Sequence, residues 1–249
     1  MAAAATLTGK NVIRLADGPS TPDRVDPKQV LPDWSDDEID ALLKTGVFDD
    51  IVYGSVRFRH REIRELLTAE WAASNIERPG GRQKIEPLFF RTSYDQEIIV
   101  PRLRPTLAWL ILFDEQIRDH ALAIAPEVAT EGGDPSRLPT SIRRAMLADI
   151  VRRIAAEDEI APWMDNAAIT RIAAADLADE TQALLQRYAS NDDAVFFLGR
   201  FVWQRAIRQC LPVLAPIATD INRGLSARIA AARAVMTAGE EKDRQAGRP

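Results

Sequence analysis

Cysteine is almost absent from this 249-residue chain, in which Cys210 is the only one. A disulfide within the chain needs two cysteines and a thiolate zinc site needs several, so both are excluded. The single thiol suits a reducing compartment, and we expect a cytoplasmic protein. Cys210 itself falls on an apolar helix face and is predicted to belong to the core.

Residues that form common catalytic centres are also scarce. The only two histidines, His60 and His120, lie far apart and outside any His-Glu-x-x-His pattern. No phosphate-binding Gly-x-x-x-x-Gly-Lys-Ser/Thr loop and no Gly-x-Ser-x-Gly elbow occurs. The acidic pairs fall at predicted turns and helix starts, where carboxylates cap exposed N–H groups. The sequence therefore predicts no enzyme, no metal site and no cofactor.

Long hydrophobic runs and net positive charge are missing as well. Residues 105–113 are too few to cross a bilayer, and residues 194–218 are interrupted by three arginines, so we expect no membrane partner. The first residues lack the basic segment of a secretory signal. A net charge of −5 and a pI near 5.3 argue against general nucleic-acid binding but leave room for a local basic patch.

The residues that are present favour helices, because alanine is abundant while aromatics make up only 6%. Residues 1–32 are polar and rich in Gly and Pro turns, which predicts a flexible N-terminal arm. Residues 33–76 are predicted to form a partial winged-helix unit. In it a short helix capped by Ser35 and Glu38 leads to a half-exposed hairpin at 48–59 and then to a helix after His60.

Residues 77–83 predict a loop and the boundary of this unit, and residues 85–238 predict an α-helical region. Helices are expected at about 101–113, 115–125, 142–154, 166–175, 178–189, 193–210 and 222–238. Amphipathic helices joined by short turns are typical of an irregular HEAT-like repeat region, although no fixed period recurs and a single irregular bundle is an alternative. Residues 239–249 predict a disordered tail. The predicted fold class is thus mainly α.

A family resemblance rests mainly on Val56-Arg-Phe-Arg-His-Arg-Glu-Ile-Arg-Glu-Leu-Leu-Thr-Ala-Glu70. This segment resembles the winged-helix element that follows the nucleotide-binding domain in NACHT-type STAND ATPases, and weaker similarity extends over residues 28–160. The resemblance implies that His60 matches the family's histidine that contacts bound ADP. The P-loop and Walker B carboxylates of that family are absent, so His60 would contact nucleotide only if a separate core supplied it.

The function expected from these observations is a non-catalytic sensor or scaffold related to signalling or defence ATPases. It would be a stand-alone or truncated C-terminal portion that binds a protein partner, such as a separate NTPase core. The alternative is a nucleic-acid-binding winged helix that uses the basic cluster of Arg57, Arg59, Arg61 and Arg64. Pairing of these arginines with Glu62, Glu65 and the preceding acidic helix would explain them equally well. An uncharacterised enzyme is a further alternative.

Overall fold

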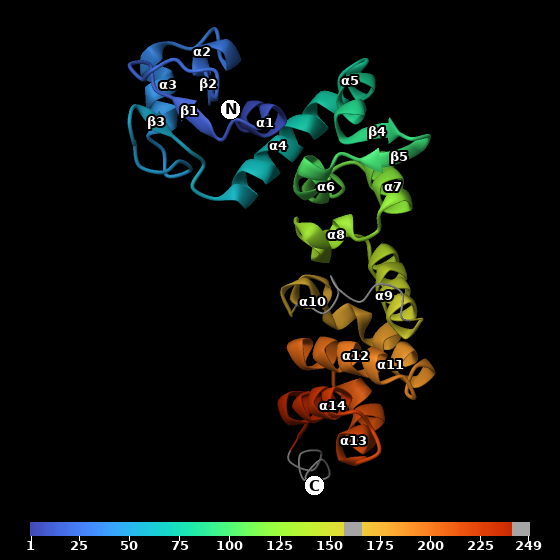
Figure 1. The fold of residues 1–249 in the computed structure, drawn as a ribbon. Helices are drawn as coiled ribbons and strands as arrows, with labels where there is room; N and C mark the ends of the chain where they lie inside the picture. Colours follow the sequence, from blue (N-terminus) through green and yellow to red (C-terminus); the bar gives the residue numbers. More distant parts are fainter. Residues whose placement is uncertain (157–165, 241–249) are drawn as a thin grey trace. The chain divides into compact units, whose positions relative to one another are not determined.

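The structure, a computed structural model, describes residues 1–156 and 166–240 and is mainly helical, as the sequence predicted. Two compact units divide the chain, residues 1–133 and 134–249, and each is described by itself (Figure 1). The sequence had placed the boundary at 77–83. The structure moves it because the helices after this segment pack back onto the long helix before it. None of the described helices is both long and apolar enough to cross a bilayer.

The first half of unit 1 contains a small sheet with helices around it. Strand β1 pairs in parallel with β2 and antiparallel with β3, in the order β2-β1-β3. The elements are α1 (Ala2–Thr8), β1 (Val12–Arg14), β2 (Arg24–Val25), α2 (Pro27–Val30), α3 (Asp36–Leu43), β3 (Ser55–Val56) and α4 (Arg61–Ile76).

The prediction of a flexible arm over residues 1–32 is wrong. Ala5, Ile13 and Val25 are buried in one core cluster with Ile39 and Val56. The ordered segments of the arm are only two to seven residues long, too short for helical or strand periodicity to be recognised. These segments are stabilised by contacts with residues beyond position 38, which lie too far along the chain for local patterns to include.

The predicted helix–hairpin–helix order over residues 33–76 is confirmed. Ser35 and Glu38 form the expected capping box, with the Ser35 N–H donating to Glu38 Oε2 at 2.7 Å. Phe48 bridges Phe58 in antiparallel fashion, and the Arg59 N–H donates to the Val47 carbonyl at 2.9 Å. The hairpin also pairs, through β3, with a strand from the supposed arm.

The second half of unit 1 departs further from the sequence prediction. It contains α5 (Gly81–Phe89), β4 (Phe90–Ser93), β5 (Gln96–Ile99), a 3-10 turn η1 (Pro101–Leu103), α6 (Arg104–Leu110), α7 (Glu115–Ile124) and α8 (Val128–Glu131). The β4–β5 hairpin lies where only helices were expected, and its turn depends on Tyr94 and Asp95 with positive φ. Arg82 binds Asp114 and so joins α5 to the start of α7.

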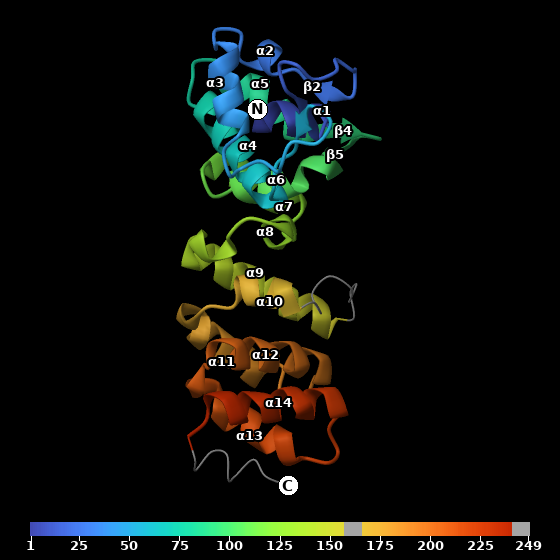
Figure 2. The ribbon, with the colours of Figure 1, turned by 90° about the vertical axis from the view of Figure 1, so that its left-hand side faces the viewer.

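Unit 2 is a stack of helices, seen in two views in Figures 1 and 2. Its elements are η2 (Pro135–Arg137), α9 (Thr140–Ala155), α10 (Asn166–Ile172), η4 (Ala175–Leu177), α11 (Ala178–Arg187), α12 (Asp192–Arg205), η5 (Arg208–Cys210), α13 (Leu211–Thr219) and α14 (Leu225–Ala238). Helix α14 packs against both α12 and α13.

Two details of unit 2 bear on the sequence prediction. Cys210 is buried as expected, and burial raises the pKa of its thiol to about 12. Helix α13 was not predicted, because its prolines argued against a helix, yet Pro212 occupies the first turn, where no N–H is required. The predicted disordered tail, 239–249, lies outside the described residues except for its first two positions.

Candidate functional site

The basic cluster predicted from the sequence is divided in the structure. The Arg57 and Arg59 side chains are exposed on the hairpin, and Arg59 lies 3.7 Å from Asp49. Arg61 donates to Glu65 at 2.6 Å, and Arg64 donates to the Asn11 side chain. The arginines therefore form no continuous cationic surface.

Acidic side chains surround the exposed end of this cluster. A pocket of about 410 Å³ is lined by Arg24 and Arg57 together with Asp23, Asp49 and Asp50. Three carboxylates beside two guanidiniums leave the pocket with no excess of positive charge to attract a phosphate backbone. His60 stands just before α4, is exposed, and makes no capping hydrogen bond with its side chain. The local charge thus does not favour nucleic acid here.

A larger apolar groove lies between α1, the α2–α3 segment, the hairpin and α4. Its volume is about 680 Å³, within the range of roughly 300–1,000 Å³ that is typical of binding pockets. Its walls include Leu7, Leu31 and Leu42 on one side and Leu67 and Trp71 of α4 on another. We call this feature the apolar groove.

Helix α4 contributes to this groove because Leu67 and Trp71 lie on its exposed side. Its buried face contains Glu65, Thr68, Ala69, Ala72 and Ile76, and α1 with its run of alanines packs against the helix. The Thr6 and Thr68 hydroxyls are 3.0 Å apart, which shows how closely the two helices approach. Leu67 and Trp71 are left 38% and 39% exposed.

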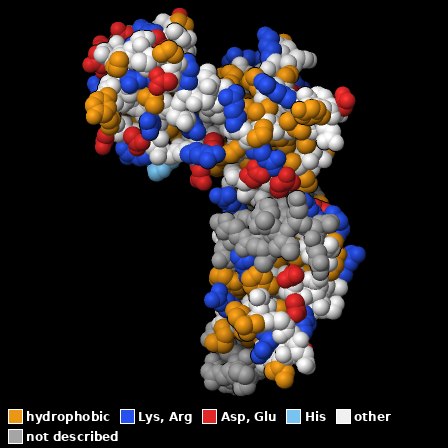
Figure 3. Space-filling view, in the orientation of Figure 1, with side chains coloured by type: hydrophobic (Ala, Val, Ile, Leu, Met, Phe, Trp, Pro, Cys, Tyr) orange, Lys and Arg blue, Asp and Glu red, His pale blue; other side chains and the backbone are white. Residues whose placement is uncertain are grey.

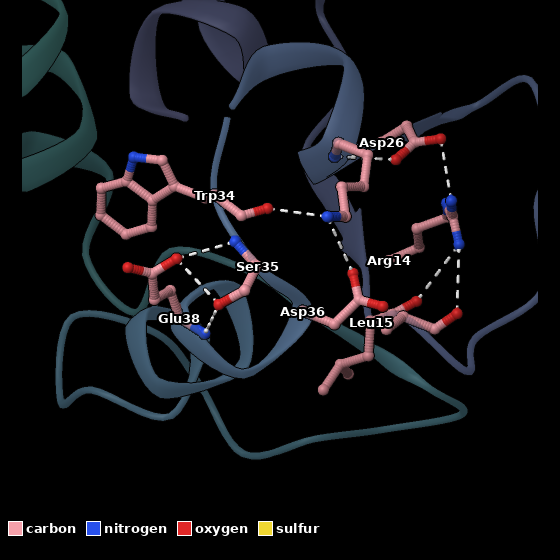
Figure 4. Close-up of polar contacts among 9 residues, drawn as sticks. Arg14, Leu15, Asp26, Trp34, Ser35, Asp36 and Glu38 are labelled. Atoms are coloured by element: carbon pink, nitrogen blue, oxygen red, sulfur yellow. Dashed lines mark hydrogen bonds and ion pairs between the residues drawn. The ribbon is translucent and has the colours of Figure 1, made fainter. Parts of the chain in front are cut away.

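Trp34 also lines the groove and is 41% exposed. It directly precedes the capping box of α3, and Figure 4 shows the Trp34 indole and the Glu38 carboxylate on the same side of the helix start. Hydrogen bonds from the backbone N–H and hydroxyl of Ser35 lower the pKa of Glu38, so this carboxylate is ionised at neutral pH. The groove therefore has an aromatic wall with an anion beside it.

Two exposed glutamates stand near the groove tryptophans in the chain. Glu70 directly precedes Trp71 on α4, and Glu38 of α3 comes four residues after Trp34. Of the nearby side-chain cations, Lys28 pairs with Asp36 at 3.1 Å, and Arg102 donates to the Leu7 carbonyl at 2.8 Å. Met1 lines the groove itself, and burial lowers the pKa of its N-terminal amine. An occupant of the groove would therefore meet mainly apolar side chains and this amine, with Glu38 and Glu70 next to the tryptophan-bearing segments.

Local sequence patterns do not reveal this groove, because Leu67 and Trp71 share the apolar stripe of their helix and would be expected in the core. Helical spacing identifies which residues share a face but does not say which of two apolar faces is covered. The signal available in the sequence was the Ala-rich opposite face of α4. Such a face can be the buried one when another Ala-rich helix packs closely against it.

A second polar cluster, also missed, contains His120 of α7 between two carboxylates. Nδ1 lies 3.0 Å from Glu86 of α5, Nε2 lies 2.8 Å from Glu97 of β5, and the Phe90 ring stacks on the imidazole. Burial acts to lower the pKa of His120, but the hydrogen bonds to Glu97 and Glu86 outweigh it and raise the pKa above 6.5. Only an imidazolium has two N–H groups to donate, so His120 is charged when it bonds to both glutamates. The two ion pairs join α7 to α5 and β5, and we call this cluster the His120 clasp.

The His120 clasp should make the stability of unit 1 depend on pH. The folded pKa of His120 exceeds the unfolded value of 6.5, so its stabilisation is complete below that pH and is lost as the pH rises through the folded pKa. We expect about 1 kcal/mol of stability to be lost across that window. Urea unfolding at a series of pH values would measure it. The pH dependence should flatten in His120→Gln, and an unchanged slope in that variant would contradict the assignment.

The two functional features differ in chemistry. Both nitrogens of His120 are engaged, so it is not free to act as a base, and no three His, Cys, Asp or Glu side chains in the described part of the chain form a metal-binding group. The apolar groove is open and unoccupied by any described side chain. No family model, curated protein or solved structure matches this chain.

Proposed function

We propose that unit 1 is a non-catalytic protein-binding module whose apolar groove holds an amphipathic helix with basic residues beside its apolar stripe. The observation that carries this proposal is the orientation of α4, which exposes Leu67 and Trp71 while it buries alanines. Exposing large apolar side chains along a groove costs solvation free energy, and that cost is recovered when a partner covers them.

The charge around the groove supports a basic partner. Glu38 and Glu70 each stand near a groove tryptophan in the chain, and α3 begins with three consecutive acidic residues. Charged groups at the rim of an interface chiefly select partners and speed association, while buried aromatic anchors supply most of the affinity. Trp34 and Trp71 are the expected anchors.

A binding module of this kind suits a sensor or scaffold acting in the cytosol. Kinship with NACHT-type signalling ATPases remains part of this proposal and rests mainly on the resemblance of segment 56–70. In that setting the partner helix would belong to a separate NTPase core or another signalling protein. The exposed position of His60 at the start of α4 leaves its imidazole available to such a partner.

The proposal can be tested with a synthetic peptide designed as an amphipathic helix, with leucines on one face and arginines on both sides of them. We expect Trp71→Ala and Leu67→Ala each to weaken its binding by about tenfold, because each removes an apolar contact surface. Isothermal titration calorimetry would measure the dissociation constants, and the same peptide with glutamate for arginine should bind more weakly than the basic one.

A matched control is Ile98→Ala, since Ile98 on β5 has the same 38% exposure as Leu67 but lies outside the groove. It should leave peptide binding unchanged. Equal binding to the wild-type chain and to Trp71→Ala, or equal binding of the basic and acidic peptides, would overturn the proposal.

A further inference from the structure

Helix α14 of unit 2 is apolar on both of its faces. Its inner face is made mostly of alanines that pack on α12, where Ala230 approaches Gly199 closely. Its outer face carries Leu225, Ile229 and Met236, which are 68%, 45% and 51% exposed. Figure 3 shows hydrophobic side chains at the surface in this region of unit 2.

The outer residues form a continuous stripe. At roughly 100° per residue, Leu225, Ile229, Ala232 and Met236 fall within an arc of about 60°. The stripe extends over three turns of helix, or about 16 Å at 1.5 Å per residue. We call it the outer stripe of α14.

Arginines stand on both sides of the outer stripe. On the same wheel Arg228 and Arg233 each lie about 70° from the centre of the stripe, on opposite sides of it. The helix from 225 to 238 contains no acidic residue. It therefore combines the two properties that the apolar groove of unit 1 requires of its occupant, an apolar stripe and basic flanks.

We infer that the outer stripe of α14 in one copy of this chain occupies the apolar groove of unit 1 in a second copy. This inference rests on the proposed function and names the partner. Leu225, Ile229 and Met236 would meet the groove residues Leu67, Trp71 and Trp34. Arg228 and Arg233 would lie opposite Glu38 and Glu70, so both the apolar and the charged parts of the two surfaces are complementary.

The two surfaces belong to different parts of the chain, so this contact is heterologous. Each copy offers one groove and one stripe, and the assembly continues head to tail until it closes into a ring or grows as a chain. An isologous dimer, in which α14 packs on α14, would instead need only the stripe. Variants in each surface separate these two modes of assembly.

The test uses the full chain with one variant in each surface. Ile229→Glu places a charge in the stripe at an exposed position, and Trp71→Glu does the same in the groove. Each variant alone should be monomeric by analytical ultracentrifugation, with the dissociation constant for self-association raised more than tenfold. An equal mixture should form a complex of twice the 27.7 kDa chain mass and no larger, because one intact groove meets one intact stripe.

Thr237→Glu is the control, since it adds the same charge at an exposed position about 110° around α14 from the centre of the outer stripe. It should assemble like the wild-type chain. A Trp71→Glu variant that still dimerises, or a mixture that stays monomeric, would overturn the head-to-tail contact. A wild-type chain that remains monomeric at millimolar concentration while the basic peptide binds the groove would overturn this inference and leave the proposed function standing; failure of the peptide as well would remove both.

Discussion

Replacing Gly81 with valine is expected to lower the free energy of unfolding of unit 1 by about 3 kcal/mol, the typical upper range for overpacking. A Cβ at this position would lie 1.8 Å from the Asn75 carbonyl oxygen and 2.9 Å from its carbon. The clash is with backbone of α4, which cannot rotate away as a side chain can. The α4–α5 connection would have to open, and α5 carries Glu86 of the His120 clasp.

Gly46 provides the control for this prediction. It also follows a helix, but no atom lies within 4 Å of a Cβ built there and its φ is not positive. Gly46→Val should change stability by no more than about 0.5 kcal/mol. Urea unfolding followed by circular dichroism gives the free energies, and hydrogen exchange of α4 and α5 locates the effect. Equal stability of Gly81→Val and the wild-type chain would show that this turn is not closed as described.

Asp176→Asn is expected to destabilise unit 2 by about 2 kcal/mol, because it leaves the guanidinium of a buried arginine without its anion, while the Asp176 side chain itself is 46% exposed. Arg143 of α9 is only 5% exposed; its Nε donates to the Leu138 carbonyl at 2.9 Å, and its Nη1 donates to Asp176 at 2.9 Å. The hydrogen bond from Arg143 also holds the pKa of Asp176 below its usual value. The ion pair thereby joins α9 to the turn before α11.

A double-mutant cycle isolates the charge. Arg143→Met removes the cation and keeps apolar volume, so it should cost less than Asp176→Asn, and adding Asp176→Asn to it should cost little more. Differential scanning calorimetry would follow the four proteins. Additive losses in the double variant would show that the two side chains are not coupled and would contradict this account.

Local sequence patterns predicted the parts of the fold that depend on neighbouring residues. The α3 capping box needs only Ser35 and Glu38, three residues apart, and the limits of α4 and α9 follow from apolar spacing over several turns. Burial of Cys210 followed from its apolar surroundings in the sequence. In each case the deciding interactions lie within one element, so no knowledge of the rest of the chain was required.

The candidate sites could not be predicted in the same way. Arg143 is a charged residue whose type alone favours exposure, yet it is buried, and Asp176, 33 residues later, binds its guanidinium. His120 looked isolated because its partners, Glu86 and Glu97, come from a helix and a strand far from it in the chain. Spacing rules describe one element at a time, and these side chains take their roles from other elements.

The sequence by itself determined a mainly helical chain with one early hairpin, because helix and turn propensities act between residues close in the chain. Only the tertiary structure decided that residues 1–32 join the first core and that α4 turns its alanines inward. It also decided that Leu67, Trp71 and the outer stripe of α14 stay exposed. Which face of a helix is covered depends on the shape and area of the surface packed against it, and distant segments supply that surface.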